Sequence, residues 1–152
     1  MIRRIISLGP DTEAALRPLA EQFFAESKLS GELNYDFLVM NIRKSLDASL
    51  MGLWVLEVED RIVGAIGGVL TSHIFTGDVI AIETFWFVTE EHRRGLGGAR
   101  LLNMFIDWAA KCDASQVHVA HMEHIHPDRM AEFYIGQRFS KLETIYVRSV
   151  WQ

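Results

Sequence analysis

Residues 79–102, VIAIETFWFVTEEHRRGLGGARLL, join an apolar strand-like run to a glycine-rich turn and then to a helix-like run. Val79–Val88 is the strongest strand signal of the chain, and its apolar character indicates burial on both faces, as at the centre of a sheet. Gly95, Gly97 and Gly98 follow closely. Because glycine loses the most conformational entropy on ordering, this cluster needs a reason, either a tight connection or a ligand that approaches the backbone.

Hydrophobic periodicity on both sides of this stretch predicts the remaining elements. The expected strands are Ile2–Leu8, Gly52–Val58, Ile62–Thr71, Val79–Val88, Gln116–His121 and Thr144–Val150. The expected helices are one capped by Asp11, with a kink or a late start at Pro18, then Tyr35–Leu50, Leu101–Lys111 and Pro127–Gly136. Three strands follow one another in the middle of the chain, so a mixed α/β sheet is expected and a doubly wound one is not.

Composition narrows the class of protein. The chain has 152 residues, 49% of them apolar and 23% charged, which predicts a single globular domain over residues 1–152. A net charge of -5 argues against a nucleic-acid partner. Cys112, the single cysteine, is expected to be a buried thiol. The apolar runs are too short for a membrane span or a secretory signal, so a soluble, cytoplasmic protein is expected.

The strand–turn–helix arrangement is typical of an anion site. The first helical N–H groups lack intrahelical partners, and the helix dipole favours negative charge there. Arg93 and Arg94 add positive charge beside the turn. The sequence is neither a Walker loop nor a dinucleotide fingerprint. A tight turn without any ligand remains an equal alternative on the glycines alone.

The turn resembles the acetyl-CoA site of the GNAT superfamily of N-acetyltransferases, whose signature is V-x-P-x-x-[QR]-x-x-G-x-[GA] followed by paired aliphatic residues. Val88 fits the strand end, Arg93 the Gln/Arg position and Gly98 the last small position. Leu101-Leu102 fits the aliphatic pair, and Trp108-Ala109 falls where the family often has Trp-Ala. The motif therefore points to acetyl-CoA as the ligand.

Two residues depart from this signature. Glu90 stands where proline is usual, and Leu96 stands where the middle glycine is usual. A register one residue earlier restores the glycines but places His92 at the Gln/Arg position, so the Arg93 register is preferred.

The resemblance extends over most of the chain after about Trp54. Val58–Ala65 resembles the family's second-to-third strand hairpin, and Glu132–Tyr134 resembles its segment before a Gly-Phe pair, although Arg138 replaces that glycine. The ending around residues 143–147 is similar to compact members found in phages and prophages.

This resemblance implies a GNAT-like, mostly antiparallel mixed sheet of about six strands, flanked by about four helices and splayed at the acetyl-CoA site. It implies that Phe87 and Val88 pair with the pantetheine arm. The residues expected around the pyrophosphate are Arg93, Arg94, Gly95, Leu96, Gly97, Gly98 and Ala99. Glu83 is the expected base, because burial in an apolar strand raises a carboxyl pKa, and Tyr134 is the expected acid.

Acetyl transfer to a primary amine of an unidentified acceptor is therefore the expected function, with acetyl-CoA as cosubstrate. The acceptor pocket is expected at the two N-terminal helices, the Ser72–Asp78 loop and His121–His126. No metal, nucleic-acid or membrane partner is expected, and a homodimer is left open. The histidines around His121–His126 fit a loop near the acceptor or plain surface better than a metal site.

Two other functions compete with this one. One is a non-catalytic acyl-CoA-binding or partner-binding domain on the same fold, motivated by Glu90 and Leu96, because fold alone never proves chemistry. The other is an unrelated phosphate or nucleotide binder that uses the same turn.

Overall fold

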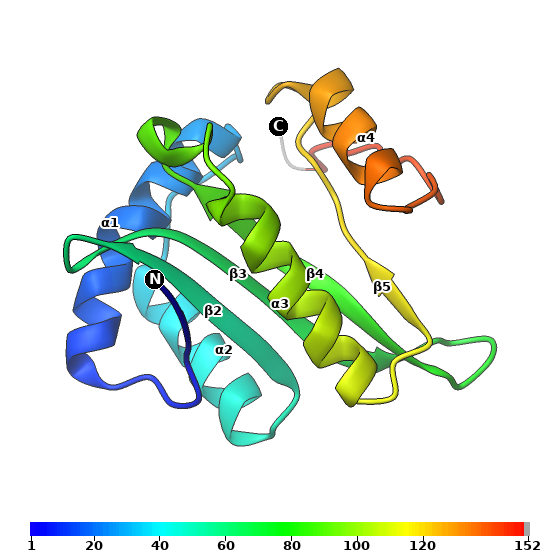
Figure 1. Cartoon of the computed structure of the whole chain (residues 1–152), viewed down its shortest axis with the longest axis horizontal. Coiled ribbons are helices and arrows are strands. Elements are labelled where there is room, and N and C mark those ends of the chain that lie inside the picture. Colours follow the sequence, from blue (N-terminus) through cyan, green and yellow to red (C-terminus); the bar gives the residue numbers. More distant parts are fainter. Residues whose placement is uncertain (151–152) are drawn as a thin grey trace. The chain divides into compact units, whose positions relative to one another are not determined.

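The computed structural model describes residues 1–150 as two compact units, residues 1–120 and the residues from His121 onward (Figure 1). The first unit contains, in order, β1 (Ile2–Arg4), α1 (Pro10–Ser27), α2 (Tyr35–Asp47), β2 (Met51–Val58), β3 (Arg61–Ser72), β4 (Val79–Val88), the short 3₁₀ helix η1 (Glu90–His92), α3 (Gly97–Lys111) and β5 (Gln116–His118). The second unit contains α4 (Pro127–Gly136).

The sheet of the first unit has the strand order β1-β2-β3-β4-β5. The pairings from β1 to β4 are antiparallel, whereas β4 and β5 run parallel. The connection between those parallel strands is α3, since a parallel pair needs a crossover that a tight turn cannot supply. The sheet is therefore mixed and mostly antiparallel, as the sequence predicts.

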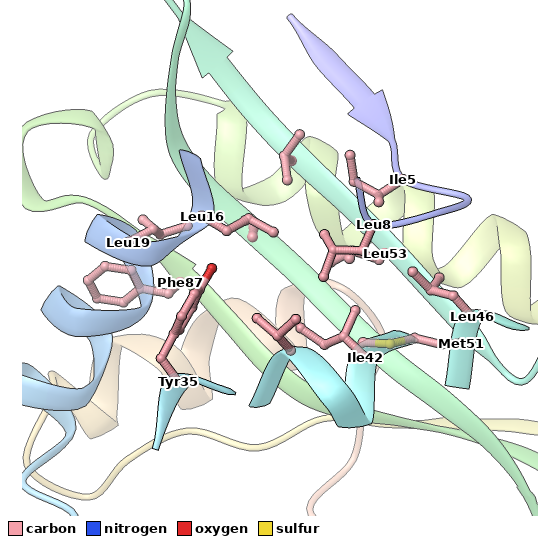
Figure 2. Close-up of a cluster of buried hydrophobic side chains, with 13 residues drawn as sticks. Ile5, Leu8, Leu16, Leu19, Tyr35, Ile42, Leu46, Met51, Leu53 and Phe87 are labelled. Atoms are coloured by element: carbon pink, nitrogen blue, oxygen red, sulfur yellow. The ribbon is translucent and has the colours of Figure 1, made fainter. Parts of the chain in front are cut away.

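The two faces of the sheet are covered by different helices (Figure 1). Side chains alternate across a strand, so Leu53 and Val55 face α1 and α2, while Trp54 faces α3 and meets Trp108 edge to face at 5.9 Å. Figure 2 shows the α1/α2 side of the core. Its buried members are Ile5, Leu8, Leu16, Leu19, Tyr35, Val39, Ile42, Leu46, Met51, Leu53, Val55, Ala65 and Phe87.

The predicted last strand, Thr144–Val150, is absent from the described residues. Ile145, Tyr146 and Val147 are 82%, 91% and 97% exposed, and none of them forms a strand pair with another residue of 1–150. High strand propensity in such residues reflects packing on a pleated, half-buried surface, which this segment lacks. The sheet accordingly has five strands where the sequence predicts about six.

Other boundaries differ by a few residues. β1 ends at Arg4 and β5 at His118, both short of the predictions, because neighbouring strands pair with them over three residues only. α2 ends at Asp47, and Ser49 then adopts a left-handed φ of 57°.

The start of α1 also corrects a prediction. Gly9, and not Asp11, is its N-cap, and Pro10 occupies the first turn, where its fixed φ suits a helix and its missing N–H costs nothing. The helix runs through Pro18, so the late start is not seen.

Candidate functional site

The end of β4 opens away from β5. The two strands pair only between Ile80–Ile82 and Gln116–His118, while β4 continues to Val88. A bulge at Thr84 lies just past the last pair, since Gly67 pairs with Phe85 and Gly68 with Glu83. A bulge bends its strand and can terminate pairing on one side. Within residues 1–150, β4 from Glu83 onward therefore presents an open edge toward β5, as the predicted splay requires (Figure 1).

The backbone of Val88 faces this open edge. Thr89 N donates to Val63 O at 2.8 Å, so Thr89 is turned toward β3 and the residue before it is turned away. The same alternation turns the backbone of Phe87 toward β3. An extended ligand chain at the open edge would meet Val88, and not Phe87, through the backbone.

Glu83 lies where the two strands diverge. Its Oε2 accepts a hydrogen bond from Ala120 N at 3.2 Å, just past the end of β5. Burial raises the pKa of the Glu83 carboxyl to about 7, while the hydrogen bond from Ala120 favours the carboxylate and acts in the opposite direction. A carboxyl with a pKa near neutrality, placed in an opening of the sheet, can accept a proton at physiological pH.

The glycine-rich turn leads from η1 into α3. Leu96 is the N-cap of α3, and no side chain caps this end. The first helical hydrogen bond is donated by Arg100 N to Leu96 O at 3.0 Å. The amides of Gly97, Gly98 and Ala99 therefore precede the first helical donor, Arg100 N, and point out of the positive end of the helix dipole.

The three glycines of the turn do not serve a left-handed backbone. Among the described residues, the glycines with positive φ are Gly31 and Gly77. A Cβ at Gly97 would lie 2.5 Å from Leu56 Cδ2, so the Leu56 side chain would have to shift to admit any other residue there. At Gly98, a Cβ would lie an ordinary 3.5 Å from the Trp86 ring. The fold itself does not demand glycine at position 98, which favours close approach of a ligand there.

The side chain of Arg93 contacts other groups of the protein. Its Nε donates to Val88 O at 2.7 Å, and its terminal nitrogen forms an ion pair with the Glu26 carboxylate of α1. Its guanidinium carbon also lies 5.0 Å from the centre of the Phe87 ring. Arg94, in contrast, is exposed. No sequence signal connects Glu26 with this turn, because 67 residues separate it from Arg93.

Tyr134 lies on α4, in the second unit, and is buried. Its ring stacks on His121 at 6.2 Å and meets Phe139 edge to face at 5.6 Å. Arg138, which replaces the expected glycine, adopts a φ of 67°, a conformation that glycine adopts readily. The aromatic packing orders Tyr134 within this unit.

Two further properties concern partners. No group of three or more His, Cys, Asp or Glu side chains in the described part of the chain is arranged to hold a metal ion. None of the helices in residues 1–150 is both long and apolar enough to cross a membrane. Cys112 is a partly buried free thiol at the end of α3.

Solved structures with the same fold include acetyltransferases of low sequence identity. An aminoglycoside acetyltransferase from an uncultured soil metagenomic sample is 16% identical, with a TM-score of 0.75 over 100% of this chain and 96% of that one. A predicted acetyltransferase with acetyl-CoA from Clostridium acetobutylicum is 10% identical, with a TM-score of 0.76 over 99% and 97%. A ribosomal-protein-alanine N-acetyltransferase from Brucella melitensis is 15% identical, with a TM-score of 0.70 over 98% and 99%.

No curated protein matches the chain significantly in sequence. The family model described as "Acetyltransferase (GNAT) family" matches residues 14–148, which include β4, the glycine-rich turn and α4. This match covers most of the chain, and the splayed sheet and the uncapped N-terminus of α3 agree with it. The chain therefore belongs to the GNAT family of acetyltransferases and is an N-acetyltransferase enzyme.

Proposed function

We propose that this enzyme transfers an acetyl group directly from acetyl-CoA to a primary amine, and that residues 1–152 act as one acetyltransferase domain. The open edge of β4, which runs from Glu83 to Val88 and ends beside the free amides of α3, carries the proposal. Acetyl-CoA would supply an activated acetyl thioester beside this edge. The chain's own residues bind and orient this thioester and transfer the protons.

Binding is proposed at two places along that edge. Val88 N–H faces the opening and suits an amide carbonyl of a pantetheine arm, much as an added strand would pair. The amides of Gly97, Gly98 and Ala99 suit a pyrophosphate, because they converge at the positive end of α3. Gly95 and Leu96 complete the turn, and exposed Arg94 adds charge.

Proton transfer is proposed for two residues. Glu83, with its pKa raised to about 7 by burial, takes the proton of the acceptor amine directly or through a water molecule. Tyr134, which stands at the tyrosine position of the family's motif, is proposed to donate a proton to the departing thiolate. Glu83 therefore accepts a proton, and Tyr134 donates one.

The acceptor is proposed to be a cationic amine. A groove of about 410 Å³ lies at the loop between α1 and α2, where Glu32 and Asp36 contribute carboxylates and Arg17 contributes one guanidinium. The Arg17 guanidinium carbon stacks 4.9 Å from the centre of the Tyr35 ring. The groove therefore offers an excess of negative charge to a positively charged acceptor. A cytoplasmic location and a homodimer stay predictions.

An acceptor screen tests the proposed function. Release of free CoA thiol from acetyl-CoA would be followed with sisomicin, with peptides that begin with alanine and with simple polyamines. Thermal shift with acetyl-CoA, ATP and NAD would run alongside, since only a ligand that prefers the native state raises the melting temperature. A shift with ATP or NAD but none with acetyl-CoA would contradict the proposal.

A further inference from the structure

The contacts of Arg93 join three parts of the first unit. Nε is bonded to Val88 O at 2.7 Å, the guanidinium carbon lies 5.0 Å from the Phe87 ring centre, and the terminal nitrogen pairs with Glu26. The Phe87 ring meets Phe23 of α1 edge to face at 5.6 Å. The last turn of α1 is thereby tied to the end of β4, immediately before the glycine-rich turn.

The Glu26 carboxylate is itself held in place. Gln22, one helical turn earlier, donates from Nε2 to Glu26 Oε1 at 3.3 Å, while Oε2 pairs with Arg93. Both side chains of the pair are about 30% exposed, and Arg93 is the least exposed arginine among the ion pairs of residues 1–150. A partly desolvated pair of fixed geometry is worth more than an exposed one.

We infer that Glu26 is a positioning residue of the proposed acetyl-CoA site, acting through the Arg93 side chain, and that this side chain is not itself a phosphate ligand. The inference rests on the proposed function. Arg93 begins the stretch that leads to the amides of Gly97 and Gly98. By fixing the Arg93 side chain against Val88, Glu26 sets where those amides lie relative to the open edge of β4.

The charges support the same division of roles. Glu26 compensates the Arg93 guanidinium, and a phosphate at that guanidinium would have to compete with the carboxylate. Arg94 and Arg100 are exposed on the same turn and first helical turn, and they are the cations that can attract a diphosphate. Arg93 therefore positions the turn, while Arg94 and Arg100 attract the negatively charged ligand.

The two roles of Arg93 predict opposite effects of one substitution. Glu26→Ala removes the carboxylate and keeps a strong helix former in α1. If Arg93 is positioned by Glu26, the dissociation constant of CoA, measured by calorimetry, rises about threefold or more. Glu26→Gln, which keeps an oxygen acceptor, lies between wild type and Glu26→Ala. If Arg93 binds phosphate, Glu26→Ala frees it, and CoA binds equally well or more tightly, which would overturn the inference.

Controls separate this effect from a general loss of stability and from failure of the proposed function. Glu21→Ala breaks the exposed ion pair of Glu21 with Arg17 on the same helix and leaves CoA affinity unchanged. Wild-type protein that does not bind CoA refutes the proposed function, whereas wild-type binding without any loss in Glu26→Ala refutes only this inference.

Arg93→Met gives a second measurement that does not depend on Glu26 variants. Under the inference, Arg93→Met weakens CoA binding, yet the salt dependence of that binding keeps its wild-type slope, because no charge contact to the ligand is lost. Glu26→Ala adds nothing in the Arg93→Met background. A shallower salt slope in Arg93→Met would identify Arg93 as a phosphate ligand and overturn the inference.

Discussion

Replacing Glu83 by Gln tests the proposed base through both rate and stability. Burial raises the Glu83 pKa from 4.5 to about 7, which corresponds to about 3 kcal/mol between the charged and neutral forms. Glutamine keeps an oxygen that can accept the hydrogen bond from Ala120 N but carries no charge. The variant therefore removes the proton acceptor and the cost of burying a carboxylate together.

The sign of the stability effect follows from the raised pKa. Below about pH 4.5, the carboxyl is neutral in both the folded and the unfolded chain, so wild type and Glu83→Gln have similar free energies of unfolding. As the pH rises to about 7, the unfolded chain ionises first and the wild type loses stability. At pH 8, Glu83→Gln should be more stable by about 2–3 kcal/mol in urea unfolding.

The rate should change in the opposite direction. In wild type, kcat/KM should rise with pH through an apparent pKa near 7, measured by thiol release with an acceptor of low amine pKa. In Glu83→Gln this inflection should vanish, and kcat should fall about 10²–10⁴-fold with CoA binding retained. Glu143→Gln, at an exposed position, is the matched control. It should change neither the inflection of the pH–rate curve nor kcat.

Two results would refute this reasoning separately. Equal stability of Glu83→Gln and wild type at pH 8 would mean that the carboxylate is not disfavoured by burial. Identical pH–rate curves for the two proteins with the low-pKa acceptor would leave a bound water, and not Glu83, as the proton acceptor.

Three other substitutions test the site and the core. Gly98→Leu should weaken CoA binding at least tenfold, about 1.4 kcal/mol in calorimetry. Gly98→Ala, whose Cβ would lie 3.5 Å from the Trp86 ring, should bind CoA nearly normally. A leucine variant with wild-type affinity would mean that the pyrophosphate does not bind at Gly98. Tyr134→Phe should lower kcat about 10²–10⁴-fold with unchanged CoA affinity, and an unchanged kcat would leave Tyr134 as a packing residue. Phe105→Ala, at a fully buried position of α3, should reduce the free energy of unfolding by about 3–5 kcal/mol in urea, and a loss below 1 kcal/mol would mean that the α3 face of the sheet is loosely packed.

Local signals in the sequence were enough for β4 and for α4, whereas α3 begins at Gly97, ahead of the predicted start at Leu101. Val79–Val88 and Pro127–Gly136 have the predicted bounds, because an apolar run ended by polar residues, and a proline in a first helical turn, act within a few residues of chain. The motif at Val88–Gly98 also led to the acetyltransferase family, which the family model confirms.

Features that depend on distant residues could not be predicted in this way. The Thr84 bulge and the early end of β5 arise from register with neighbouring strands, and the Glu26–Arg93 pair joins residues 67 positions apart. The predicted strand at Thr144–Val150 was wrong for the same reason, since strand-forming side chains need a partner backbone that sequence cannot supply. The sequence by itself determined the order of elements from β1 to α4 and the family, while only tertiary packing decided where the sheet opens, how far burial raises the pKa of Glu83 and what holds Arg93.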